Sequence, residues 1–70
     1  MEQFIFLKNP AALKSKSNEI KKHLQNGCKT SDVKLIFNFV APDSVLENIQ
    51  NEFRIIKNRI AFNSDCKIYN

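Results

Sequence analysis

Apolar side chains recur at intervals of three and four residues in the C-terminal half of the chain. The repeating positions are Leu46, Ile49, Phe53, Ile56 and Ile60. On an α-helix these intervals place all five side chains along one narrow seam, which is typical of a helix that buries one side. The pattern therefore predicts a helix whose seam packs against the rest of the chain, a second copy or another molecule.

Two signals mark the start of this helix. Pro42 suits the first helical position, where its missing N–H costs nothing, whereas Ser44 and Glu47 would form a capping box slightly further on. The two alternatives differ by about two residues, within the usual error of a predicted boundary. The helix is predicted to end near residue 60, because Asn63-Ser64-Asp65 follows.

Two segments have the pattern of β-strands. Residues 33–40 alternate between a fully apolar face and a mixed face. The two sets are Val33, Leu35, Phe37 and Phe39, and Lys34, Ile36, Asn38 and Val40. Residues 3–7 are aromatic and β-branched on both faces, which favours a central strand that is covered on each side.

Between these strands the sequence predicts a helix over residues 10–26. Asn9 is a suitable N-cap, Pro10 follows at the first helical position, and Gly27 suits a left-handed terminator. The apolar face of this segment is thin, with Leu13, Ile20 and Leu24 aligned. Because Lys-Ser-Lys-Ser weakens its middle, a start only at Ser17 is an open alternative.

The order of elements predicts a small two-layer α/β domain over residues 1–70, with an α+β arrangement as the alternative. In this β-α-β-α order, both helices pack on one face of a two- or three-stranded sheet whose first two strands are parallel. Residues 66–69 could add a final edge strand. Sixteen residues are candidates for the core: Phe4, Ile5, Phe6, Leu7, Leu13, Ile20, Leu24, Val33, Leu35, Phe37, Phe39 and the five seam residues.

More apolar residues are present than this core requires. Val45, Ile55 and Phe62 lie off the seam, and a two-layer protein leaves the second face of its sheet open, with Ile5 or Phe6 and Leu7 contributing to it. Exposed apolar patches mark interaction sites. The candidate interaction residues are Ile36, Val40, Ile55 and Phe62.

The net charge of +4 arises entirely in residues 1–34, which hold seven lysines and three acids. On a continuous α-helix Lys14 and Lys21 nearly eclipse and Lys22 flanks them, while Lys29 lies at the end. These four lysines form a candidate basic patch for phosphates. This region contains no arginine, the usual reader of guanine edges, so sequence-specific DNA recognition is disfavoured.

No pattern of catalytic, metal-binding or nucleotide-binding residues is present. One glycine cannot build a phosphate-binding loop, and Cys28, Cys66 and the single His23 cannot supply four zinc ligands. We therefore expect no cofactor, no small-molecule substrate and no enzymatic activity. The chain has no signal-peptide pattern and no apolar stretch of membrane-spanning length, so we expect a cytoplasmic protein with free thiols and no membrane partner.

These observations favour a non-enzymatic interaction protein. It would bind and modulate a protein partner, as inhibitors, antitoxins and accessory subunits do, or form a homodimer. The alternative is weak, sequence-non-specific nucleic-acid binding through the lysines of the first helix. Salt dependence separates the two, because counterion release weakens nucleic-acid binding steeply.

Overall fold

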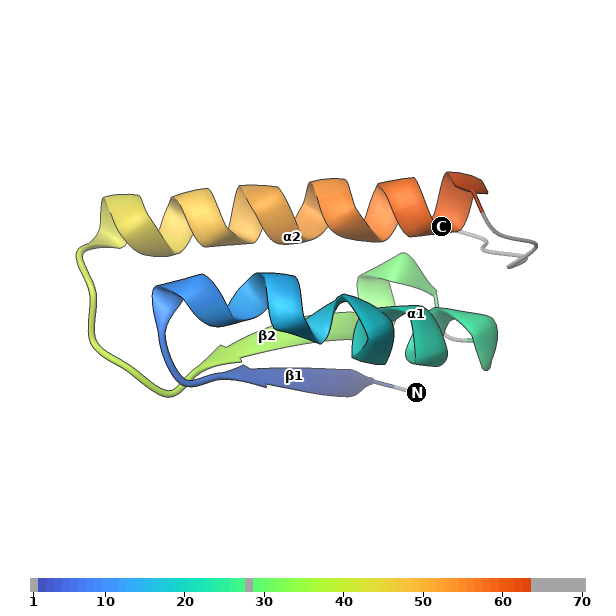
Figure 1. The fold of residues 1–70 in the computed structure, drawn as a ribbon, viewed down its shortest axis with the longest axis horizontal. Coiled ribbons are helices and arrows are strands. Elements are labelled where there is room, and N and C mark those ends of the chain that lie inside the picture. Colours follow the sequence, from blue (N-terminus) through green and yellow to red (C-terminus); the bar gives the residue numbers. More distant parts are fainter. Residues whose placement is uncertain (1, 28, 64–70) are drawn as a thin grey trace.

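The computed structural model describes residues 2–27 and 29–63. Its elements are β1 (Gln3–Leu7), the 3₁₀-helix η1 (Pro10–Lys16), α1 (Ser17–Gln25), the 3₁₀-helix η2 (Thr30–Asp32), β2 (Val33–Phe37) and α2 (Asp43–Asn63). Figure 1 shows η1 and α1 between the two strands and the long α2. The predicted small α/β domain is confirmed. Cys28, Cys66 and the strand predicted at 66–69 lie outside the described residues.

The two strands run parallel, with Gln3 opposite Val33 and Leu7 opposite Phe37. Side chains alternate between the faces of a strand, so this register sorts them into two sets. Ile5, Leu7, Val33 and Leu35 are buried beneath the helices, while Phe4, Phe6, Lys34 and Ile36 are exposed on the opposite face.

The prediction that residues 3–7 form a central, doubly covered strand is wrong for the part of the chain described. β1 pairs only with β2, and the helices cover one face of the sheet. Phe4 and Phe6 therefore leave the predicted core. Of the residues proposed for the open face, Ile5 and Leu7 are buried and Phe6 is exposed.

β2 ends at Phe37, although the alternating pattern continues to Val40. The reason is the length of its partner, because a strand persists only where another strand hydrogen-bonds to it. The backbone N–H of Asn38 donates to the carbonyl of Leu7 at 2.8 Å, and β1 stops there before Asn9 and Pro10. The residues beyond Asn38 enter the connection to α2.

Both alternatives for the first helix describe part of what forms. Asn9 caps the segment, since its Oδ1 accepts from the backbone N–H of Ala11 at 3.0 Å, but residues 10–16 are 3₁₀ and the α-helix begins at Ser17. Ser15 and Ser17 donate their hydroxyls to the carbonyls of Ala12 and Lys14. These side-chain bonds compete with regular helical bonds and explain the tighter winding.

The ends of α1 and α2 follow local backbone chemistry. α1 ends at Gln25, one residue before the predicted end, and Gly27 follows the C-cap Asn26 with a φ of 93° that few other residues adopt, as expected of the terminator. α2 begins at Asp43, one residue from each predicted start, because the carbonyl of Pro42 accepts the N–H groups of Val45 and Leu46. α2 continues to Asn63 rather than ending near residue 60.

The core lies between the sheet and the helices, and among the described residues it is apolar apart from Thr30. Its nine buried apolar residues are Ile5, Leu7, Leu13, Ile20, Leu24, Val33, Leu35, Ile49 and Phe53. The predicted seam of α2 faces this core, with Ile49 and Phe53 buried and Leu46, Ile56 and Ile60 half-buried. Phe37, Phe39 and Val45 pack against its margin.

Candidate functional site

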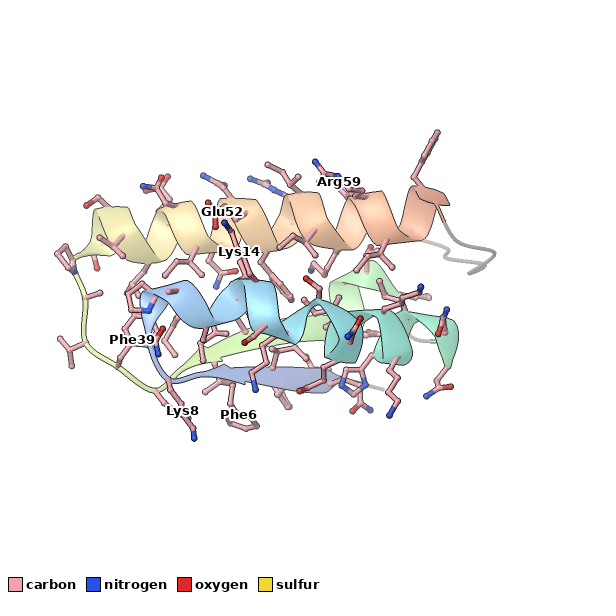
Figure 2. All side chains as sticks on the ribbon, in the orientation of Figure 1. Phe6, Lys8, Lys14, Phe39, Glu52 and Arg59 are labelled. Atoms are coloured by element: carbon pink, nitrogen blue, oxygen red, sulfur yellow. The ribbon has the colours of Figure 1, made fainter. Side chains whose placement is uncertain are left out.

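The uncovered side of the sheet, which we call the outer face, consists of Phe4, Phe6, Lys34 and Ile36. Phe6 lies opposite Ile36 in the ladder and Phe4 opposite Lys34. The exposed fractions are 42% for Phe4, 52% for Phe6 and 36% for Ile36. In Figure 2 Phe6 points away from α2, together with Lys8. Two aromatic rings and an isoleucine therefore lie side by side on a face that no described element covers.

One end of the outer face carries an ion pair between Lys34 and Glu2. The hydrogen bond from Lys34 to the Glu2 carboxylate, together with the negative charge of that group, raises the pKa of Lys34. Both side chains are about half exposed, so the pair is a small contribution to stability. Its effect is to neutralise the charge beside Phe4, which leaves the middle of the outer face apolar.

The four predicted interaction residues are all exposed, but the structure does not bring them together. Ile36 belongs to the outer face and Val40 to the connection between β2 and α2. Ile55 and Phe62 are seven residues apart on α2 and share its solvent side, since the buried Phe53 faces the core. The residues that do accompany Ile36 are Phe4, which the sequence pattern placed in the core, and Phe6, which it offered both for the core and, as the alternative to Ile5, for the open face.

The four lysines of the predicted basic patch are also exposed. They come from different elements: Lys14 from η1, Lys21 and Lys22 from α1, and Lys29 from the residue before η2. The near-eclipse of Lys14 and Lys21 required a continuous α-helix, and the 3₁₀ winding of η1 removes that relation. In Figure 2 Lys14 extends toward α2. Lys21 and Lys22 remain neighbours on α1.

Lys57 has a role that the sequence did not predict. Its Nζ donates to the carbonyls of Thr30 at 2.9 Å and Val33 at 3.1 Å, and lies 4.4 Å from the centre of the Phe53 ring. Burial lowers the pKa of Lys57, and the positive charge of Arg54 lowers it further.

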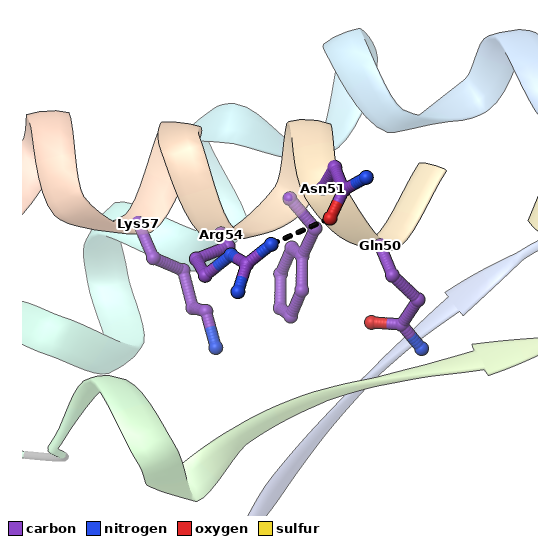
Figure 3. A pocket seen from close by; sticks show the side chains of 5 residues that line it. Gln50, Asn51, Arg54 and Lys57 are labelled. Atoms are coloured by element: carbon purple, nitrogen blue, oxygen red, sulfur yellow. Dashed lines mark hydrogen bonds between the residues drawn. The ribbon is translucent and has the colours of Figure 1, made fainter. Parts of the chain in front are cut away.

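A pocket of about 330 Å³ opens between α2 and β2, and we call it the α2–β2 pocket. Its lining residues all come from α2: Gln50, Asn51, Phe53, Arg54 and Lys57. Figure 3 shows the side chains of Gln50 and Lys57 extending from α2 toward β2 and η2. The Arg54 guanidinium donates to Asn51 Oδ1 at 2.5 Å. The lining therefore combines two cations, two amides and one aromatic ring, and it contains no acid.

Within residues 2–27 and 29–63, no three His, Cys, Asp or Glu side chains gather as metal ligands would. None of the helices in this part of the chain is both long and apolar enough to cross a membrane. His23 is half-buried on α1, one residue before the buried Leu24. The most prominent surface features described are thus the outer face and the α2–β2 pocket.

The chain matches no protein-family model, no curated protein and no solved structure. Arguments about its function therefore rest on its own residues.

Proposed function

We propose that this chain is a non-enzymatic interaction protein that binds a protein partner, either another protein or a second copy, through its outer face. The observation that carries the proposal is the group of Phe4, Phe6 and Ile36 on the uncovered side of a parallel sheet. Parallel sheets occur almost only where both faces are covered. A partner that supplied the second layer would complete the usual arrangement.

The chemistry of the outer face suits protein rather than nucleic acid. Aromatic side chains are enriched at the centres of protein interfaces, where charged residues are depleted. The charged residue in the ladder, Lys34, is paired with Glu2, so it offers a phosphate little net attraction. Phe6 and Ile36 adjoin each other across the strands and would form the centre of the contact.

The size of the outer face argues for a modest affinity. Two five-residue strands present much less surface than the roughly 800 Å² that each partner contributes to a standard stable interface. Contacts around the sheet must add to those of the three apolar residues. We therefore expect binding in the micromolar range, as in regulatory complexes that form and dissociate.

Two matched variants test the proposal. Phe6 and Ile55 are exposed to nearly the same extent, 52% and 55%, but Phe6 lies on the outer face and Ile55 on the solvent side of α2. Immobilised wild type, Phe6→Ser and Ile55→Ser are used to capture partners from the native host, and the captured protein is then purified and titrated. Phe6→Ser should weaken binding at least tenfold, since hot-spot truncations cost about 2 kcal/mol, and Ile55→Ser should not.

Nucleic acid is the competing occupant. If the captured molecule were RNA or DNA, released by salt and lost in the double variant Lys21→Glu/Lys22→Glu, the outer face would not be the functional surface. Equal loss in Phe6→Ser and Ile55→Ser would also contradict the proposal, because it would place the binding surface elsewhere.

A further inference from the structure

The edge of β2 that faces away from β1 carries unpaired backbone groups. Successive residues of a strand direct their N–H and C=O groups toward opposite edges. The N–H of Asn38 donates to Leu7 on β1, so the groups of Leu35 and Phe37 point the other way. In the part of the chain described, no strand lies on that side of β2. Leu35 and Phe37 thus offer donors and acceptors to an added strand.

Within residues 2–27 and 29–63, a side chain protects only the start of this edge. The carbonyl of Val33, on the same edge as those of Leu35 and Phe37, accepts from the Lys57 ammonium. A charged side chain held against an edge is a common device that prevents unwanted strand pairing. Among the described residues that device stops at Val33, and no strand pairs with the stretch from Leu35 to Phe37 on this edge.

The α2–β2 pocket lies beside this edge, because Lys57 joins the two. The pocket holds the positive charges of Arg54 and Lys57 and has no acidic lining residue. The buried Phe53 supplies an apolar wall. Burial lowers the pKa of Lys57, and the positive charge of Arg54 lowers it further. A carboxylate in the pocket would relieve the repulsion between the two cations, and an arginine binds carboxylates with charge-assisted hydrogen bonds.

We infer that the edge of β2 and the α2–β2 pocket together bind an extended peptide segment of another protein, which pairs with Leu35 and Phe37 and places an acidic side chain against Arg54. Addition of a strand to an exposed edge is an established mode of peptide recognition, in which the backbone supplies affinity and a side-chain pocket supplies selectivity. This inference does not depend on the proposed function, because the edge and the outer face are different surfaces of β2.

The test begins with a phage-displayed library of random heptapeptides, selected against the wild-type protein. The enriched peptides should contain Asp or Glu flanked by β-branched residues. The best binder is then synthesised in two forms, with its acidic residue intact and with that residue replaced by its amide. Both are titrated against wild type, Arg54→Gln and, as a matched control, Arg59→Gln on exposed α2 surface.

The acidic peptide should bind wild type and Arg59→Gln alike, and about fivefold more weakly to Arg54→Gln, the effect of a partly exposed ion pair. Arg54→Gln should also lose the preference for the acidic form over the amide form. In amide hydrogen exchange, the peptide should slow exchange at Leu35 and Phe37.

Three results would overturn the inference. These are enriched peptides without acids, protection confined to Phe4 and Phe6, and a selection that yields no binder. A further contradictory result is a dimer in which β2 pairs with β2 of a second copy, with the same two amides protected and no peptide bound. That result would assign the edge to a second copy and would also reject the inference.

Discussion

The Lys57 ammonium connects the C-terminal half of α2 to the start of β2 through hydrogen bonds. It donates to two carbonyls, those of Thr30 and Val33, while its Nζ lies over the ring of Phe53. Sequence patterning assigns such a residue to the solvent, because lysine is rarely buried and nothing in the local sequence indicates a partner 24 residues away. Contacts of this kind arise from the tertiary fold, so periodicity cannot reveal them.

Replacing Lys57 by Met should destabilise the protein by about 1 kcal/mol. The variant loses two charge-assisted hydrogen bonds, which stabilise by roughly 1.5–3 kcal/mol each when fully formed. It also removes two unfavourable contributions, the burial of a charge and the repulsion of that charge by Arg54. Urea unfolding of Lys57→Met and of the control Arg59→Met, which removes an exposed charge from the same helix, measures the difference. Equal midpoints would show that the contacts of Lys57 contribute nothing to the stability of the protein.

Phe53 is the residue on which the seam prediction depends most directly, and it is buried in the core with 2% of its surface exposed. Phe53→Ala should lower the free energy of unfolding by about 3–5 kcal/mol, because the deletion leaves a cavity. Ile55→Ala, two residues away on the solvent side, should change it by less than about 0.5 kcal/mol. Thermal unfolding compares them; a wild-type midpoint in Phe53→Ala would refute the packing of α2.

At the scale of elements, the sequence identifies α2 well and β1 poorly. The seam repeats over five positions, so its phase is determined by the sequence alone and agrees with the observed burial. β1 has apolar residues at four consecutive positions, Phe4 to Leu7, and either alternate pair could face the helices. Only the register with β2 decides that Ile5 and Leu7 enter the core, which exposes Phe4 and Phe6.

Gly27 follows the C-cap of α1 with a φ of 93°, and a Cβ built there meets nothing within 4 Å. Gly27→Ala should therefore destabilise the protein only through backbone strain, by about 1–2 kcal/mol. Gly27→Asn should cost less, because asparagine tolerates positive φ. Chemical denaturation of both variants measures the order. If Gly27→Ala and Gly27→Asn lowered the free energy of unfolding equally, backbone strain would not be the cause. Lost flexibility or a change in the unfolded chain would then explain the effect.

In the part of the chain that the structure describes, the sheet has one covered face and one uncovered face, and the net positive charge of the chain arises in residues 1–34. We expect association with protein to respond little to ionic strength, since the outer face is apolar and its charges are paired. Sedimentation of the complex at low and moderate salt should give similar affinities. Lys21→Glu/Lys22→Glu, which reverses the neighbouring charges on α1, should leave both the fold and the affinity unchanged.

The parallel pairing of β1 with β2 has a consequence for how the chain folds. Gln3 meets Val33 thirty positions further along, so each rung of the ladder closes a long loop. Closure of a loop of that length costs about 3 kcal/mol in chain entropy beyond a constant. Two short strands cannot offset this alone, so β1 remains unpaired until residues 30–37 have been synthesised and the helices can collapse onto the sheet. Until then Ile5 and Leu7 are exposed to solvent together with Phe4 and Phe6. The nascent chain is most prone to aggregate at this stage.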